Sequence, residues 1–258
     1  MVDLDPDADG TFFEENYVTG IITTKAGDAT RTANGDSFQP EVSREGTYLV
    51  FRSTATDIHA DTASTAAMAY AMGQVKREIT VPFGVNVLWD PMSSVALAAA
   101  TGASFIREIL TGTYASDMGP WNPDAGAAMR YRDRLGRNDL VMFDNISAEF
   151  AWSLDQRSLP DRARSAVFSS IPDAILVSGI ITGEAAALSD LEAVKKVLPD
   201  TPVLANTGVK HATVADVLKI ADGCIVGTAL KVDGNTWNAV DPERAKEFMR
   251  LARAARGH

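Results

Sequence analysis

Cysteine is almost absent from this chain of 258 residues: Cys224 stands alone, so no disulfide can form within the chain. It lies in a short apolar run that we expect to be a buried strand, which is a poor setting for a nucleophilic thiol. A chain without disulfides suits a reducing compartment, and we therefore expect a cytoplasmic protein.

Positive charge is also scarce, since 24 Lys and Arg face 34 Asp and Glu and give a formal net charge of -10. A nucleic-acid surface needs a basic stripe, which the chain lacks, so we expect no nucleic-acid partner. The three histidines, His59, His211 and His258, do not have the spacing of metal ligands. No Walker, GxGxxG or Ser-His-Asp pattern occurs in a fitting context, and we expect neither a metal nor a cofactor.

Long hydrophobic runs are missing as well. No apolar stretch reaches the roughly 18 residues that a membrane-spanning helix needs, so we expect no span. The first residues, Met1 to Asp7, are acidic and lack the apolar core of a signal peptide.

What the chain does have is a regular alternation of apolar strands and amphipathic helices after residue 80. That rhythm predicts a parallel sheet with helical crossovers, and the length suits one (β/α)₈ TIM barrel over residues 1–258. Six strands are expected within 81–88, 105–110, 140–147, 174–179, 203–205 and 224–226, and a seventh at 11–17. The eighth strand is either 48–52 or missing. Residues 18–60 are irregular and predict an inserted loop or lid in an altered first part of the barrel.

Two Gly-Thr turns close the last two expected strands. Thr207-Gly208 follows Val203-Leu204-Ala205, and Gly227-Thr228 follows Cys224-Ile225-Val226. Glycine lets main-chain amides approach an anion, and the loops after strands seven and eight are the usual phosphate site of a TIM barrel. We therefore predict that these four residues bind a phosphate. The alternative is that both are plain strand-end turns.

Polar residues gather at the carboxyl ends of the expected strands, where TIM barrels have their sites. We predict catalytic or charge-bearing roles for Glu15, Arg107, Asp117, Asp144 and Glu149. The predicted substrate- and phosphate-binding residues are Asn16, Asn86, Ser178, Gly179, Asn206, Thr207, Gly208, Gly227, Thr228 and Lys231. The alternative is a structural ion-pair network, with Lys231 a solvated loop lysine.

Several runs resemble one known family. They read GVNVLWDPMSSVALAAATGASFIRE from Gly84, GTYASDMG from Gly112, PDAILVSGIITG from Pro172, PVLANTGV from Pro202 and ADGCIVGTALKVDG from Ala221, with WNAVDPERAKEFM from Trp237. In their order along the chain and in their residues these runs are similar to the BtpA/SgcQ family, and DADGTFFEENY resembles the family's second strand. The resemblance implies a TIM barrel related to ribulose-phosphate-binding barrels such as phosphoribosylanthranilate isomerase. It also implies links to photosystem I biogenesis and to sugar use.

The chain departs from that family in three places. Many members carry Asp-Val-His-Val-Lys-His after strand five, but Asp144 to Glu149 reads DNISAE here, without the histidines and the lysine. Glu149 stands where a histidine would be, so an acid/base role could continue with a carboxylate. Little room precedes Glu15 for a first strand and helix, so the front is short or 46–52 fills the gap. The third departure is the extra segment 18–60.

Three functional hypotheses follow from the residues and the resemblance. The first is an enzyme that binds a phosphorylated sugar or phosphoribosyl compound and performs isomerase or aldolase/lyase-type acid/base chemistry. The second is a non-catalytic assembly or biogenesis factor, and the third is a regulator that binds a phosphorylated metabolite. We expect a phosphorylated small molecule as partner and, because the front of the barrel is incomplete, a homo-oligomer.

Overall fold

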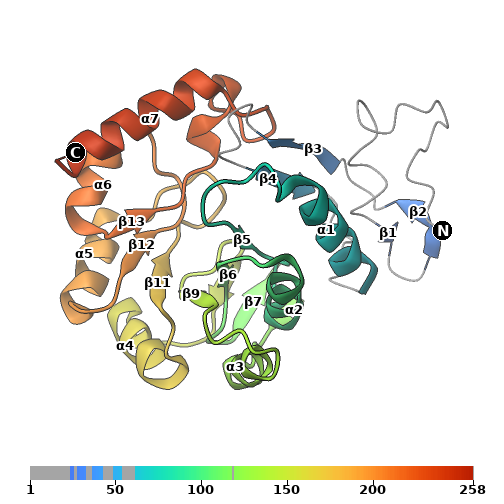
Figure 1. Cartoon of the computed structure of the whole chain (residues 1–258). Helices are drawn as coiled ribbons and strands as arrows, with labels where there is room; N and C mark the ends of the chain where they lie inside the picture. The colour runs from blue at the N-terminus through green and yellow to red at the C-terminus, as the bar shows by residue number, and fades with distance from the viewer. Residues whose placement is uncertain are drawn as a thin grey trace.

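A curved parallel sheet with helices along its outer side dominates the computed structural model, which describes residues 24–25, 28–32, 37–42, 49–53, 62–117 and 119–257 (Figure 1). In this described part the sheet has six parallel strands in the order β13-β12-β11-β9-β6-β5. The strands are β5 (Gly84–Val85), β6 (Phe105–Glu108), β9 (Val141–Asn145), β11 (Ala174–Val177), β12 (Val203–Ala205) and β13 (Gly223–Cys224). The predicted α/β barrel architecture is confirmed, although the strands are shorter than the apolar runs suggested.

Helices alternate with these strands along the chain, as the crossover of parallel strands requires. They are α1 (Thr62–Val75), α2 (Pro91–Thr101), α3 (Ala125–Arg134), α4 (Leu159–Ser170), α5 (Leu188–Val197), α6 (Val214–Ile220) and α7 (Pro242–Ala255). Two 3₁₀ turns, η1 (Thr228–Leu230) and η2 (Val232–Gly234), connect β13 to α7. The alternation of strands and helices expected after residue 80 is therefore confirmed.

Helix starts follow local capping chemistry. Asp241 caps α7 by accepting hydrogen bonds from the amides of Glu243 and Arg244 at 2.9 and 3.3 Å, with Pro242 at the first helical position, as expected. Asp90 caps α2 in the same way. α5 has no such cap, because Ala187 precedes Leu188 and makes no side-chain hydrogen bond to the helix amides.

Two hydrophobic clusters fix the helices on the sheet. One lies under α1, α2 and α3 and centres on Val95, Leu97 and Ile106. The other lies under α4 to α7 and centres on Ile175, Leu191 and Val203. These side chains are essentially fully buried. Burying each one stabilises the fold by about 1.5–3 kcal/mol. The packing of the helices on the outer face therefore stabilises the sheet, and its carboxyl edge can carry polar groups.

The front of the chain differs from the simplest expectation. Segment 48–52 was a candidate eighth barrel strand, but β4 (Leu49–Ser53) pairs antiparallel with β3 (Ser37–Val42), so it does not join the parallel sheet. β1 (Thr24–Lys25) pairs antiparallel with β2 (Asp28–Thr32). The expected strand 11–17 lies outside the described residues.

A three-stranded antiparallel sheet is formed by segments that follow β6 and β9 in the chain. The segment after β6 contains β7 (Tyr114–Ser116) and β8 (Gly119–Trp121), and β10 (Ala151–Ser153) pairs with β7. Tyr114 is buried, and Trp89 and Trp121 pack edge to face at 5.4 Å between ring centroids. Within the described ranges, no helix has the length and apolar character needed to cross a bilayer.

Candidate functional site

Strand register brings four polar side chains to one face of the sheet. Arg107 is level with Phe143, Asn145 with Leu176, and Val177 with Ala205. Side chains at the same level of a parallel sheet point to the same face, and alternate residues share that face. Arg107, Asn145, Ser178 and Asn206 therefore follow one another around the inner carboxyl edge. The stacked Phe105 and Phe143 rings, with centroids 5.2 Å apart, lie on the same face nearer the other end.

These four residues and Glu149 form a closed circle of hydrogen bonds, which we call the strand-end ring. Arg107 donates from Nη2 to Glu149 Oε1 at 2.6 Å and from Nε to Asn206 Oδ1 at 3.0 Å. Asn206 Nδ2 donates to Ser178 Oγ at 2.6 Å and to Glu149 Oε1 at 3.1 Å. Ser178 Oγ donates to Asn145 Oδ1 at 3.1 Å, and Asn145 Nδ2 donates to Glu149 Oε2 at 2.9 Å.

Glu149 is the centre of the strand-end ring, since three donors converge on its carboxylate. All three contacts use the oxygens of its carboxylate as acceptors. The side chains of Arg107 and Glu149 are 25% and 13% exposed, which leaves the pair reachable from one side. A carboxylate fixed by donors next to a guanidinium can take a proton from a bound molecule or orient its carbonyl or hydroxyl groups.

The backbone beside Glu149 is strained. Phe150 has φ 58°, a left-handed conformation that non-glycine residues rarely adopt. Its amide donates to the Ile180 carbonyl at 3.0 Å, and its carbonyl accepts from the Asp117 amide at 3.0 Å. These two bonds hold the strained residue between neighbouring loops and so fix the direction from which Glu149 reaches the ring.

The two Gly-Thr turns leave adjacent strands at the same edge of the sheet. β12 and β13 are parallel neighbours, and the Ile225 amide donates to the Ala205 carbonyl at 2.8 Å just before the second turn. Among the hydrogen bonds of the described residues, none uses the amides of Gly208, Gly227 or Thr228 as donors. A Cβ added at Gly227 would meet open space. Amides of this kind can receive an anion.

Gly208 is required by its surroundings. Its φ is 67°, and an added Cβ would overlap the backbone of Glu184 and Ala185. The same loop reaches the other turn, because a Cβ at Gly183 would come 3.5 Å from Thr228 Oγ1. Residues 183–185, which follow β11, therefore lie against both Gly-Thr turns.

Two buried carboxyl groups lie behind the ring, on the helix side of the sheet. Burial raises the pKa of Asp144 to about 6, although Leu110 N and Thr111 Oγ1 donate to it at 2.8 and 3.0 Å. Burial also raises the pKa of Glu108 to about 8; Ser94 Oγ donates to its Oε1 at 2.7 Å. Both carboxyl groups are fully enclosed, so Asp144 does not join the strand-end ring and acts on it only through the backbone.

The other predicted residues are placed as follows. Asn86, with its amide nitrogen toward β6, donates to Glu108 Oε1 at 2.8 Å and to the Arg107 carbonyl, so it supports Arg107 from behind. The Gly179 amide donates to Thr207 Oγ1 at 2.7 Å and is thus partnered within the protein. Lys231 is buried rather than a solvated loop lysine, and Asp117 is exposed on the β7–β8 hairpin.

Two of the predicted residues, Glu15 and Asn16, lie outside the described residues. Over the part of the chain that the structure describes, no cluster of three or more His, Cys, Asp or Glu side chains is arranged to hold a metal ion.

Sequence reasoning missed Asn145 as a site residue and selected its neighbour Asp144 instead. The two neighbours face opposite sides of the sheet, and the register assigns the inner face to Asn145. One sequence signal could have found it. Asn145 follows Phe143 by two residues, just as Arg107 follows Phe105, and the two phenyl rings stack on the inner face.

Comparison with known proteins agrees with this architecture. Residues 51–254 match the model of the BtpA family. The putative sgc region protein SgcQ of Escherichia coli K12 is 48% identical over 186 residues, which cover 72% of this chain and 69% of that protein. The photosystem I biogenesis protein BtpA of Synechocystis is 31% identical over 191 residues, which cover 73% of this chain and 66% of that protein. The alignments thus span about two thirds of both relatives.

A solved structure shares the fold at low sequence identity. N-(5'-phosphoribosyl)anthranilate isomerase from Pyrococcus furiosus superposes with a TM-score of 0.50 at 15% identity, covering 76% of this chain and 84% of that one. This likeness concerns the barrel fold. The family match over most of the chain and the two relatives together show that the chain belongs to the BtpA family.

Proposed function

We propose that this protein is an enzyme that binds a phosphorylated sugar or phosphoribosyl compound at the carboxyl edge of its sheet. The observation that carries the proposal is the shared edge: Asn206, which donates to Glu149 in the strand-end ring, follows the same strand β12 as Gly208, and Gly227 and Thr228 follow the adjacent strand β13. An anionic phosphate would accept from those amides while the rest of the molecule extends toward Glu149.

In this mechanism Glu149 moves a proton on the bound substrate, and Arg107 with Asn206 orients a carbonyl or hydroxyl oxygen. Isomerisation and aldol or retro-aldol cleavage both need a base next to a carbon that bears a carbonyl neighbour. Asp144 and Asn86 serve as positioning residues behind the ring. Asp117, exposed on the β7–β8 hairpin, and Lys231, buried between η1 and η2, stay candidates for substrate contact.

A specific observation favours a second candidate function. In this alternative the protein is a non-catalytic assembly factor that has kept the barrel fold. The relative in Synechocystis is named a photosystem I biogenesis protein, and the run DNISAE lacks the histidines and lysine that the resemblance to the family led us to expect after strand five. A regulator that binds a phosphorylated metabolite without turnover is the third candidate. A cytoplasmic location and a homo-oligomer stay predictions.

Ligand binding separates the enzyme and the regulator from the assembly factor. We expect phosphorylated pentoses or hexoses, but not the free sugars, to raise the melting temperature. At 100 times the Kd the gain is about 2.7 kcal/mol, which for a protein of this size is about 5–10 °C. Gly227→Asp adds a negative charge to the open turn and should abolish the shift.

The matched control is Gly73→Asp, which adds the same charge at an exposed, open position of α1. It should keep the full shift. No shift with any sugar phosphate, or an equal loss in both variants, would favour the assembly factor and contradict the proposed site.

A further inference from the structure

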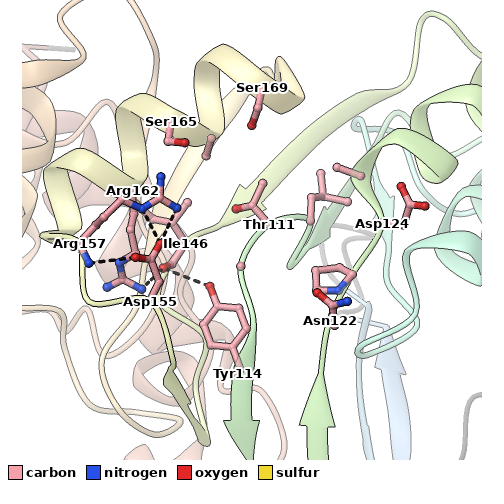
Figure 2. A pocket seen from close by; sticks show the side chains of 15 residues that line it. Thr111, Tyr114, Asn122, Asp124, Ile146, Asp155, Arg157, Arg162, Ser165 and Ser169 are labelled. Carbon is pink, nitrogen blue, oxygen red and sulfur yellow. Dashed lines mark hydrogen bonds and ion pairs between the residues drawn. The ribbon is translucent and has the colours of Figure 1, made fainter.

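A second hollow lies apart from the strand-end ring, between α3 and α4 (Figure 2). Elsewhere the outer helices pack against their neighbours, α1 on α2, α2 on α3, α4 on α5 and α6 on α7. Between α3 and α4 there is instead a cavity of about 430 Å³. That volume falls within the range of small-molecule sites, and no ring residue lines it.

The walls of this cavity are polar and oppositely charged. In Figure 2, Asp155, Arg157 and Arg162 lie on one wall, and Thr111, Asn122 and Asp124 lie across from them. Ser165 and Ser169 of α4 add hydroxyl groups above the arginines. Polar and charged side chains outnumber apolar ones in the lining, so the cavity does not resemble an unfilled piece of hydrophobic core.

The charge on the α4 wall is only partly compensated. Arg157 Nε donates to Asp155 Oδ2 at 2.7 Å, and its amide donates to Asp155 Oδ1 at 2.9 Å, so these two charges satisfy each other. Arg162 Nη1 donates to the Ile146 carbonyl at 3.2 Å. Its Nε is buried and, among the described residues, has no hydrogen-bond partner. Because Nε is enclosed by protein, a molecule in the cavity would reach the guanidinium through Nη2, which makes no hydrogen bond to a described residue. A hydrogen bond from a charged donor of this kind to an oxyanion is a strong one.

The opposite wall offers hydrogen-bond acceptors and carries a negative charge. Asp124 caps α3 by accepting from the Ala127 amide at 2.8 Å, a position at which the helix dipole favours a negative charge. Asn122 Oδ1 accepts from Thr113 Oγ1 at 3.2 Å. A molecule with hydroxyl groups could donate to this wall while an oxyanion faces Arg162.

We propose that the cavity between α3 and α4 binds a small hydroxylated molecule that carries one oxyanion, a carboxylate or a phosphate, facing Arg162. This site is distinct from the strand-end ring and does not depend on the function proposed for the ring. Its two ends differ in charge, so a neutral polyol of the same size should bind far more weakly.

A local chemical probe tests the proposal. Ser165→Cys is made in a Cys224→Ala background, which leaves one thiol in the chain, and its reaction with a disulfide reagent is timed. The probes are D-gluconate, sorbitol 6-phosphate and sorbitol, which share a carbon skeleton and differ in the oxyanion. We expect gluconate or sorbitol 6-phosphate at ten times its Kd to slow labelling about tenfold, and sorbitol to leave it unchanged. Which of the two anions protects distinguishes a carboxylate site from a phosphate site.

Controls keep the test specific. Arg164→Cys, exposed on the same helix and outside the cavity, should label at the same rate with every probe. Arg162→Gln should remove the protection of the thiol introduced by Ser165→Cys, whereas Asn206→Ala, in the strand-end ring, should keep it. Ser169→Glu adds a negative charge at an exposed lining position and should also weaken protection, which covers the case that Arg162→Gln fails to fold.

The proposal is overturned if neither anion slows labelling of the Ser165→Cys protein, if sorbitol protects equally, or if protection survives Ser169→Glu and a folded Arg162→Gln unchanged. Circular dichroism and the melting temperature of each variant establish which proteins are folded.

Discussion

Arg107 Nη2 lies 2.6 Å from Glu149 Oε1, although 42 positions separate the two residues in the chain. Asn206 contacts both, with its oxygen accepting from Arg107 Nε and its nitrogen donating to Glu149. The pair therefore belongs to the strand-end ring at the carboxyl edge of the sheet, in which each side chain orients the next.

The first prediction concerns the strength of that pair. Arg107→Met leaves the carboxylate with fewer donors, and Glu149→Gln removes the charge that Arg107 faces. Because both side chains are largely enclosed, we expect a coupling free energy of about 1–2 kcal/mol in a double-mutant cycle. Urea unfolding of the four proteins measures it. A coupling near zero would mean that the ion pair is solvated and does not organise the ring.

The second prediction concerns Gly208. Gly208→Ala must hold a side chain at φ 67° and push back the backbone of residues 184–185. We expect it to lower the free energy of unfolding by about 3 kcal/mol or more. Gly136→Ala is the matched control, with φ 68° but open space around the added Cβ, and should cost only about 1–2 kcal/mol. Equal losses in the two variants would show that residues 183–185 do not press on the turn.

The third prediction is a pH dependence. Burial raises the folded-state pKa of Glu108 to about 8, above its unfolded value of 4.5. Between these values the folded state binds more protons than the unfolded state, so stability from this group is present at low pH and is lost as pH rises through 8. Glu108→Gln lacks this loss.

The free energy of unfolding of Glu108→Gln, minus that of the wild type, should therefore increase by up to about 1.4 kcal/mol per pH unit between about pH 5 and pH 8. Glu192→Gln, exposed on α5, should give a flat difference over the same range. A flat difference for Glu108→Gln as well would show that its carboxyl group is ionised in the folded protein.

Local patterns predicted the barrel well because each strand and helix after residue 80 is a continuous run of sequence with capping or turn residues at its ends. Asp241-Pro242 marked the start of α7, and the apolar run 174–177 marked a fully buried strand. The sheet of β7, β8 and β10 was missed since the pairing of β10 with β7 joins Ala151 to Ser116 across β8, α3 and β9. No local signal encodes such a pairing.

The candidate site was predicted in part. Arg107, Glu149, Ser178 and Asn206 were selected by their positions at strand ends, and the structure brings them together. Asp144 was selected for the same reason but faces the helices, because a side chain's face depends on strand register rather than on its place in the run. Segment 48–52 was one of two options for the eighth strand, because its apolar run suits an antiparallel pair, which the structure shows, as well as a barrel strand.

The most direct measurement of the central proposal follows proton exchange on a bound sugar phosphate. A ketose phosphate that raises the melting temperature is incubated with the protein in D2O, and NMR records deuterium at the carbon next to the carbonyl. We predict that the wild type incorporates deuterium and that Glu149→Gln does so at least about 100-fold more slowly, while its melting-temperature shift with the same ligand remains. Binding without any incorporation in the wild type, or equal rates in both proteins, would contradict Glu149 as the residue that moves the proton.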